Sequence, residues 1–131
     1  MRLLALAPAA LLLTLGACAS TDGNVAPPPA GFDASASQFE GWARIQDGEI
    51  RLYANQRDLR GFPTNCVSGA LPRNLQRTAL DLSGLKIRLH GRTAAWADRD
   101  GAQTFDWQGS NITNACRREV VILADRVEAL R

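Results

Sequence analysis

The chain has few of the residues on which enzyme active sites most often depend. Among its 131 residues there is one histidine, His90, and no catalytic or cofactor motif stands out. A hydrolase needs a nucleophile, a base and an orienting acid, and these cannot be assembled here without that histidine. A hydrolase is therefore the least favoured class of function, and we expect no catalytic residues, no cofactor and no metal site.

Strong charge of one sign is also missing. The 15 arginines and lysines face 13 aspartates and glutamates, which leaves a formal net charge of +2. Such a chain produces no overall field that would attract a polyanion, so we expect no nucleic-acid partner. Beyond residue 15 the sequence also contains no apolar run of the roughly 20 residues that a membrane-spanning helix needs.

The one long apolar run lies near the beginning of the sequence. Arg2 precedes a segment rich in leucine and alanine from Leu3 to Leu15, which Pro8 interrupts. A short apolar run behind a positive charge is typical of a secretory signal peptide rather than of a permanent membrane anchor. The sequence therefore predicts a cleaved signal peptide over residues 1–17.

The residues at the end of this run, Leu15-Gly16-Ala17-Cys18, resemble the lipobox of bacterial lipoprotein precursors at all four positions. The resemblance implies that Cys18 becomes a lipidated N-terminus whose acyl chains hold the protein on a bilayer. Ala19 follows where lipoproteins retained in the inner membrane commonly carry Asp, so it also implies the outer membrane of a Gram-negative cell, facing the periplasm. The alternative is an ordinary secretory signal.

The next segment is expected to be a flexible tether over residues 18–37. From Ala19 to Ala36 it consists mostly of small residues and proline, with Pro27-Pro28-Pro29 in the middle. A segment with so few large apolar side chains cannot bury enough surface to fold. We therefore expect a folded domain over residues 38–131 that stands several nanometres at most from the lipid.

The clearest structural signal in that domain is Asp47-Gly48, a dipeptide suited to a two-residue hairpin turn. With this turn at the tip, Trp42 pairs with Tyr53, Arg44 with Arg51, and Gln46 with Glu49. One face then carries only apolar residues and should face the core; these are Ala43, Ile45, Ile50 and Leu52. The opposite face, with its two arginines and two aromatic rings, should be open to water or to an anionic ligand.

The remaining patterns predict further strands and one short helix. Leu85 to His90 alternates apolar and polar residues, and Gly91 suits a bulge or bend that lets the strand continue to Trp96. The other expected elements are a helical turn at Asn55–Leu59, a strand at Cys66–Leu71, a helix capped by Asn74 with Leu75, Ala79 and Leu82 inward and Gly84 at its end, a strand at Ala102–Gln108, a loop at Gly109–Asn114 and a central strand from Glu119 to Ala129. The order resembles the small, mainly antiparallel oligonucleotide/oligosaccharide-binding (OB) barrel.

Two cysteines, Cys66 and Cys116, remain once Cys18 carries lipid. An even pair in an oxidising compartment favours a disulfide. Neither cysteine has a histidine or another cysteine at metal-binding spacing, so a thiol nucleophile or metal ligand is the less favoured interpretation.

The best functional hint is the outward row Lys86, Arg88, His90 and Arg92. Guanidinium groups beside aromatic rings suit phosphate, carboxylate and sugar ligands. The residues expected to join the row are Arg44, Arg51, Arg117 and Arg118, with Trp42, Tyr53, Trp96 or Trp107 nearby. We therefore hypothesise a membrane-tethered binding module for an anionic envelope component or a periplasmic protein.

The second hypothesis is a protein inhibitor of a cell-wall-degrading enzyme. Some small disulfide-bonded lipoproteins block lysozymes, and Ser68-Gly69-Ala70-Leu71 is similar to their inhibitory loop in its Ser-Gly pair. The tyrosine of that motif is absent here.

Overall fold

The computed structural model describes residues 24–130; the predicted signal peptide and Cys18 lie outside them. The elements are β1 (Gln38–Gln46), β2 (Glu49–Tyr53), the 3₁₀ helix η1 (Gln56–Arg60), β3 (Cys66–Ala70), the 3₁₀ helix η2 (Arg73–Leu75), α1 (Gln76–Leu80), β4 (Lys86–Ala95), the 3₁₀ helix η3 (Trp96–Asp98), β5 (Phe105–Trp107), β6 (Ser110–Ile112) and β7 (Val120–Ala129). No helix in this range is long and apolar enough to cross a membrane.

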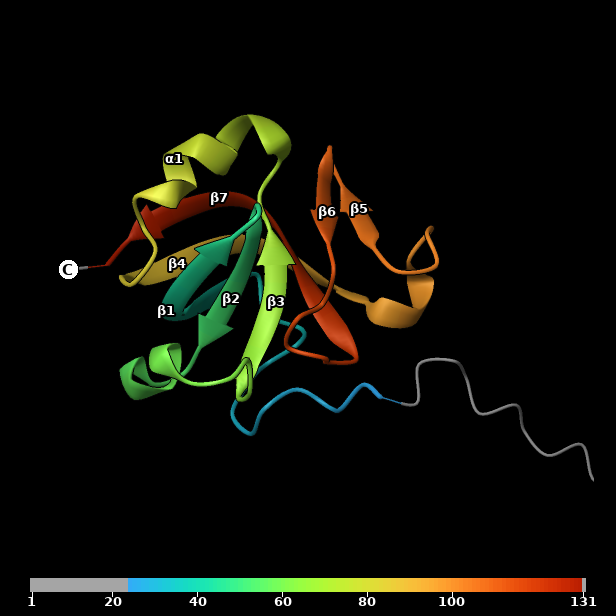
Figure 1. Ribbon diagram of the computed structural model, residues 1–131, viewed down its shortest axis with the longest axis horizontal. Helices are drawn as coiled ribbons and strands as arrows, with labels where there is room; N and C mark the ends of the chain where they lie inside the picture. The colour runs from blue at the N-terminus through green and yellow to red at the C-terminus, as the bar shows by residue number, and fades with distance from the viewer. Residues whose placement is uncertain (1–23, 131) are drawn as a thin grey trace, which may run out of the picture.

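Five strands close into a small barrel in the order β1-β2-β3-β7-β4, which confirms the expected OB-like, mainly β fold (Figure 1). Every neighbouring pair is antiparallel except β3 and β7, which run parallel. The short helix α1 lies between β3 and β4 in the chain and sits at the top of the barrel in Figure 1. The apolar side chains that alternate along the strands fill the interior, including Ile87, Leu89 and Ile122.

The β1–β2 hairpin has the predicted register. Trp42 pairs with Tyr53, Arg44 with Arg51 and Gln46 with Glu49. Asp47 and Gly48 have φ angles of 53° and 80°, the positive values that a two-residue turn of this kind requires. The turn therefore fixes which residues of both strands enter the core.

The bend expected at Gly91 is present, but the extra residue belongs to the neighbouring strand. The β4–β7 register shifts between His90 and Gly91, because His90 pairs with Arg126 and Gly91 with Ala124, which leaves Asp125 of β7 unpaired. At Gly91 itself the backbones approach so closely that an added Cβ would lie 2.1 Å from the carbonyl oxygen of Leu123. Glycine is needed here for this contact.

Four details of the predicted elements were wrong. Leu85 precedes β4 and is 47% exposed rather than facing inward. Asn74 does not cap α1; it lies inside η2. The strand expected over 102–108 is only Phe105–Trp107, and part of the expected loop after it forms β6, so that β5 and β6 make a separate hairpin. The inward contacts of Leu75, Ala79 and Leu82 are nevertheless as predicted.

The expected tether is wrong for its second half, because residues 25–36 pack on the barrel. Ala26 forms a parallel bridge with Arg118, and its NH donates to the carbonyl of Arg117 at 2.9 Å. Phe32 stacks on Phe39 with ring centroids 5.4 Å apart and reaches the core. Composition failed here because two apolar side chains, Val25 and Phe32, suffice to hold an otherwise small-residue segment. The ordered domain therefore begins more than ten residues before the predicted boundary at residue 38.

Candidate functional site

The outward row predicted on β4 is not a free cationic surface. Arg88 lies between Glu40 of β1 and Glu128 of β7, which the barrel places directly opposite it on either side. Its Nε donates to the Glu40 carboxylate at 2.8 Å and its Nη1 to that of Glu128 at 3.0 Å. These bonds raise the pKa of Arg88, those from Glu40 most. One arginine of the row is thus already neutralised by two carboxylates.

His90 belongs to the same network. Its Nε2 lies 2.8 Å from Oε1 of Glu128, and Nη2 of Arg126 lies 3.4 Å from its Nδ1. Because a guanidinium can only donate, the arrangement suits an imidazole that carries its proton on Nε2 and donates it to Glu128. The bonds from His90, and then from Arg88, hold the pKa of Glu128 below its usual range. We call these residues the charge ladder: Glu40, Arg88, His90, Arg126 and Glu128.

The other predicted members of the row are Lys86 and Arg92. Both are exposed, and the Arg92 guanidinium lies 5.6 Å from the centroid of the Trp107 ring. Trp107 is held in place because its indole NH donates to the carbonyl of Ala124 at 2.8 Å. The predicted pairing of arginine and aromatic ring is therefore present at this end of the row, as an internal contact of the chain.

The hairpin face expected to be open is largely covered. Tyr53 is fully buried against the Cys66–Cys116 disulfide, so its assignment to a ligand-binding face is wrong. Arg44 donates to the carbonyl of Leu59 at 2.7 Å, and half-buried Arg51 donates to Gln46 at 3.4 Å. Trp42 is half-buried and packs against the same disulfide cluster.

The cover comes from the long connection between β4 and β7. Its residues 113–116 bind the buried carboxylate of Glu49, and Cys116 joins Cys66 of β3 in the predicted disulfide, with 5.5 Å between the Cα atoms. Ser110 of the β5–β6 hairpin donates its hydroxyl to the carbonyl of Leu71. Ligands of OB barrels normally bind on the face of the second and third strands. In this chain the face carries the chain's own loop, so a ligand must bind elsewhere.

Two other predicted neighbours also serve the structure. Arg118 donates to the carbonyls of Cys66 and Pro27 at 3.1 and 2.7 Å, which ties the N-terminal segment to β3. Trp96 is buried, and the Arg99 guanidinium lies 4.6 Å from its ring centroid. Arg117 is exposed and has a positive φ of 54°.

The segment Ser68-Gly69-Ala70-Leu71 is not a loop. Its first three residues belong to β3, and all four residues are buried. An added Cβ at Gly69 would lie 2.7 Å from the carbonyl oxygen of Ile122, so the strand is closely packed there. The motif that suggested a lysozyme inhibitor is therefore inaccessible to an enzyme.

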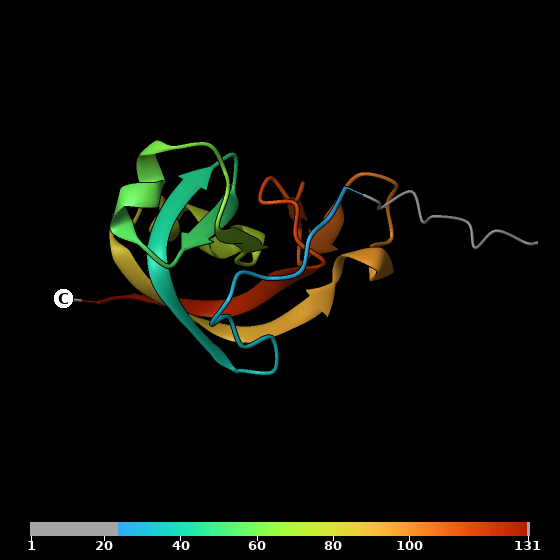
Figure 2. The same cartoon turned by 90° about the horizontal axis from the view of Figure 1, so that it is seen from below.

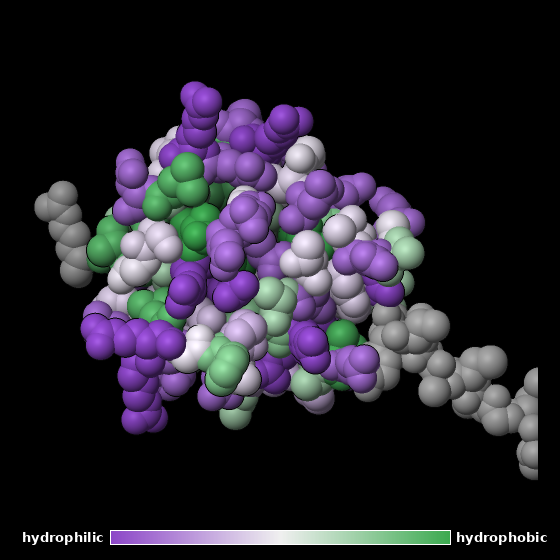
Figure 3. Space-filling view, in the orientation of Figure 1, coloured by the Kyte–Doolittle hydropathy of each residue, from purple (hydrophilic) through white to green (hydrophobic). Residues whose placement is uncertain are grey.

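A polar cleft that the sequence did not reveal lies between η2–α1 and the turn of the β5–β6 hairpin. Its volume is about 640 Å³, and it is lined by Arg73, Asn74, Gln76, Arg77, Gln108 and Gly109. Among these lining residues there are two guanidiniums, three amides and no carboxylate. Figure 3 shows hydrophilic side chains gathered over η2 and α1 at the top of the barrel. We call this region the polar cleft.

The two walls of the polar cleft are fixed to each other. The NH of Arg73 donates to the carbonyl of Gln108 at 3.1 Å, and Nε2 of Gln76 donates to Oγ of Ser110 at 2.6 Å. Gln108 and Gly109 have positive φ angles of 44° and 86°, which turn the hairpin tightly at the edge of the cleft. The four-residue spacing of Arg73 and Arg77 was visible in the sequence, but nothing in it indicated that a turn 35 residues later would face them.

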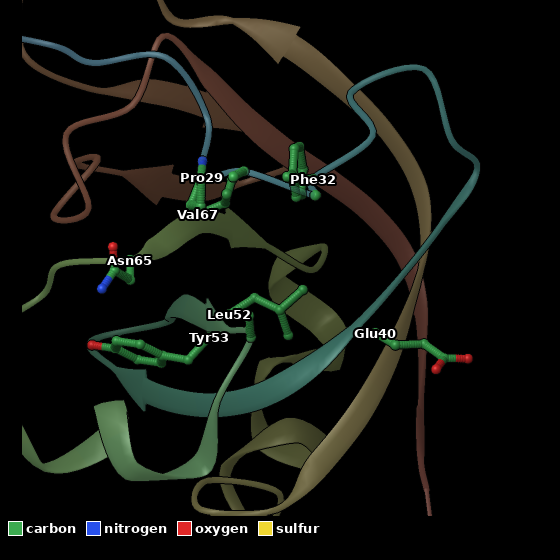
Figure 4. A pocket seen from close by; sticks show the side chains of 10 residues that line it. Pro29, Phe32, Glu40, Leu52, Tyr53, Asn65 and Val67 are labelled. Carbon is green, nitrogen blue, oxygen red and sulfur yellow. The ribbon is translucent and has the colours of Figure 1, made fainter.

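A second pocket, of about 240 Å³, opens between the N-terminal segment and the ends of β2 and β3 (Figure 4). Phe32, Leu52 and Val67 provide apolar walls, and Glu40 is the one charged lining residue. That carboxylate is already engaged by Arg88. The Tyr53 hydroxyl has no hydrogen-bond partner in the described part of the chain, but in Figure 4 its ring extends away from Phe32 and Glu40. This pocket offers a ligand little polar recognition.

Residues 24–130 contain no group of three histidine, cysteine, aspartate or glutamate side chains that could hold a metal ion. In the comparisons with known proteins, no family model, no curated protein and no solved structure matches this chain.

Proposed function

We propose that the chain is a lipid-anchored protein of the bacterial envelope whose barrel binds an anionic, hydroxyl-rich ligand in the polar cleft. The observation that carries this proposal is the composition of the cleft, in which Arg73 and Arg77 lie among amides without a lining carboxylate to neutralise them. The outward arginine of the charge ladder, by contrast, is paired on both sides.

The chemistry of the lining suits a saccharide that carries a carboxylate or phosphate. Guanidinium groups make strong, geometrically specific hydrogen bonds to both of these anions. Amide side chains offer both donors and acceptors, which suits the hydroxyl groups of a sugar. Sugars of this kind are abundant in the bacterial envelope, as components of lipopolysaccharide and peptidoglycan.

The location follows from the N-terminal sequence rather than from the barrel. Leu15-Gly16-Ala17-Cys18 resembles a lipobox, and the Cys66–Cys116 disulfide suits an oxidising compartment such as the periplasm. Incorporation of labelled palmitate tests the anchor directly. Wild-type protein should take up the label and the Cys18→Ser variant should not; equal labelling of both would contradict the anchor.

The ligand site is tested by retention of the protein on isolated peptidoglycan sacculi and on lipopolysaccharide-coated beads. The test variant is Arg73→Gln/Arg77→Gln, and the control Lys86→Gln/Arg92→Gln removes the same charge from the exposed ends of the predicted row. Each lost charge-assisted bond is worth about 1.5–3 kcal/mol, so we expect at least roughly tenfold weaker retention of the cleft variant on one of the two probes.

The control variant should be retained like wild type. A loss in the control alone would place the site on β4, and unchanged retention of both variants would refute an anionic envelope ligand in the cleft. Unfolding by urea should be the same for both variants and wild type, because the four substituted side chains are not buried.

A further inference from the structure

The ordered N-terminal segment brings the barrel close to its predicted lipid anchor. Only six residues separate Cys18 from Asn24, the first described residue, and a fully extended chain covers at most about 3.6 Å per residue. Asn24 can therefore lie no more than about 20 Å from the lipidated position. A tether of this length restricts which side of the barrel can face the bilayer.

The side that carries the N-terminal segment also carries an unusual exposed side chain. Phe62 is 86% exposed, the largest value among the exposed large apolar residues of the described chain. It lies in the loop 61–65 between η1 and β3. The end of this loop, Asn65, lines the same pocket as Pro29 and Gly31 of the N-terminal segment. Figures 1 and 2 show the loop and the segment on the side of the barrel away from α1.

Basic side chains surround this exposed phenylalanine. Arg57 and Arg60 of η1 are both exposed, and neither forms an ion pair within residues 24–130. Hydrophilic side chains gather over η1 at the lower left of Figure 3. An aromatic ring beside arginines is the combination that favours the boundary between anionic headgroups and acyl chains.

We propose that η1 and the loop 61–65 form a docking surface for the anionic bilayer on which the chain is anchored, with Phe62 inserted among the lipids and Arg57 and Arg60 on their phosphates. This proposal rests on the lipid anchor proposed above. The charges are complementary to anionic lipids, and the chain leaves the barrel on the same side. The docked surface fixes the orientation of the barrel, with the polar cleft directed away from the membrane.

The test uses the lipidated full-length product reconstituted in vesicles of phosphatidylethanolamine and phosphatidylglycerol that contain brominated acyl chains. Phe62→Trp introduces a fluorophore at the docking surface, and Leu80→Trp introduces one on α1, at a residue that is 56% exposed. The wild-type signal from Trp42, Trp96 and Trp107 is subtracted. Because an inserted side chain lies roughly 5–10 Å into the interface, we expect about half of the emission of Trp at position 62 to be quenched and almost none at position 80.

Adding Arg57→Gln/Arg60→Gln to the Phe62→Trp variant should lower the quenching, as should replacing the anionic lipid with phosphatidylcholine. Equal quenching at positions 62 and 80 would overturn the docking surface while leaving the anchor intact. Failure of wild-type protein to incorporate palmitate would instead overturn the anchor itself. The two proposals therefore fail in different experiments.

Discussion

The buried carboxylate of Glu49 should be the main organiser of the loop that covers β2 and β3. Its Oε1 accepts hydrogen bonds from the backbone NH groups of Thr113 and Asn114 and from the Thr113 hydroxyl, and its Oε2 accepts from the NH of Ala115 at 2.9 Å. The residue is only 6% exposed, so water cannot replace a lost partner. Glu49→Gln keeps the shape of the side chain but replaces one acceptor oxygen with an NH₂ group.

The magnitude follows from the number of bonds affected. The amide NH₂ must face at least one NH group, most economically that of Ala115, which removes a charge-assisted bond worth about 1.5–3 kcal/mol. The three bonds to the remaining oxygen become neutral, and neutral bonds are roughly half as strong as charge-assisted ones. The lower cost of burying a neutral group offsets part of this loss. We expect the free energy of unfolding to fall by about 3 kcal/mol.

Equilibrium unfolding in urea measures this change. With a slope of about 1.5 kcal/mol per molar urea for a domain of this size, the midpoint should fall by about 2 M. Glu119→Gln, which changes an exposed carboxylate a few residues away, is the control and should stay within about 0.5 kcal/mol of wild type. A Glu49→Gln midpoint equal to that of the control would refute the assigned role of the carboxylate.

Two further predictions concern the cross-link and the charge ladder. Removing the Cys66–Cys116 disulfide, which closes a sequence separation of 50, should cost about 4 kcal/mol of stability by urea unfolding; two free thiols in the denatured, unreduced protein would contradict the bond. The folded-state pKa of Glu128 is lowered from an ordinary value of 4.5, so its stabilisation is present above pH 4.5 and is lost as the pH falls through the lowered value. The urea midpoints of wild type and Glu128→Gln should therefore converge on acidification, and salt should narrow their difference at neutral pH because the carboxylate is 46% exposed; a gap that widens toward pH 3 would contradict this assignment.

The parts of the fold that sequence could predict are those set by local geometry. Asp47-Gly48 determines a turn type, the turn determines the register, and the two-residue period then assigns every side chain of the hairpin to a face. The same period placed Ile87 and Leu89 inward and Arg88 outward, as observed.

What sequence could not predict are the neighbours that long-range pairing supplies. Alternation indicates that Arg88 points outward, but not that Glu40 and Glu128, 48 and 40 residues away, occupy the adjacent strands. The expected binding row became an internal ion-pair network for this reason. The polar cleft was missed for the same reason, since its second wall is the turn at Gln108, within a segment that was expected to contain no hairpin.

The distribution of arginines then explains why function should lie at the ends of this barrel rather than on its faces. Closing five strands places the outward arginine of β4 between two carboxylates, and the long β4–β7 connection occupies the face that OB barrels normally offer to ligands. The arginines of η1 and of η2–α1 lie outside the sheet and escape this pairing. They form two basic ends, one beside the N-terminal segment and one at α1, on opposite sides of the barrel in Figure 1. An anchor at one end and a ligand cleft at the other is the arrangement that lets a protein held within about 20 Å of a bilayer still reach a ligand in the space beyond it.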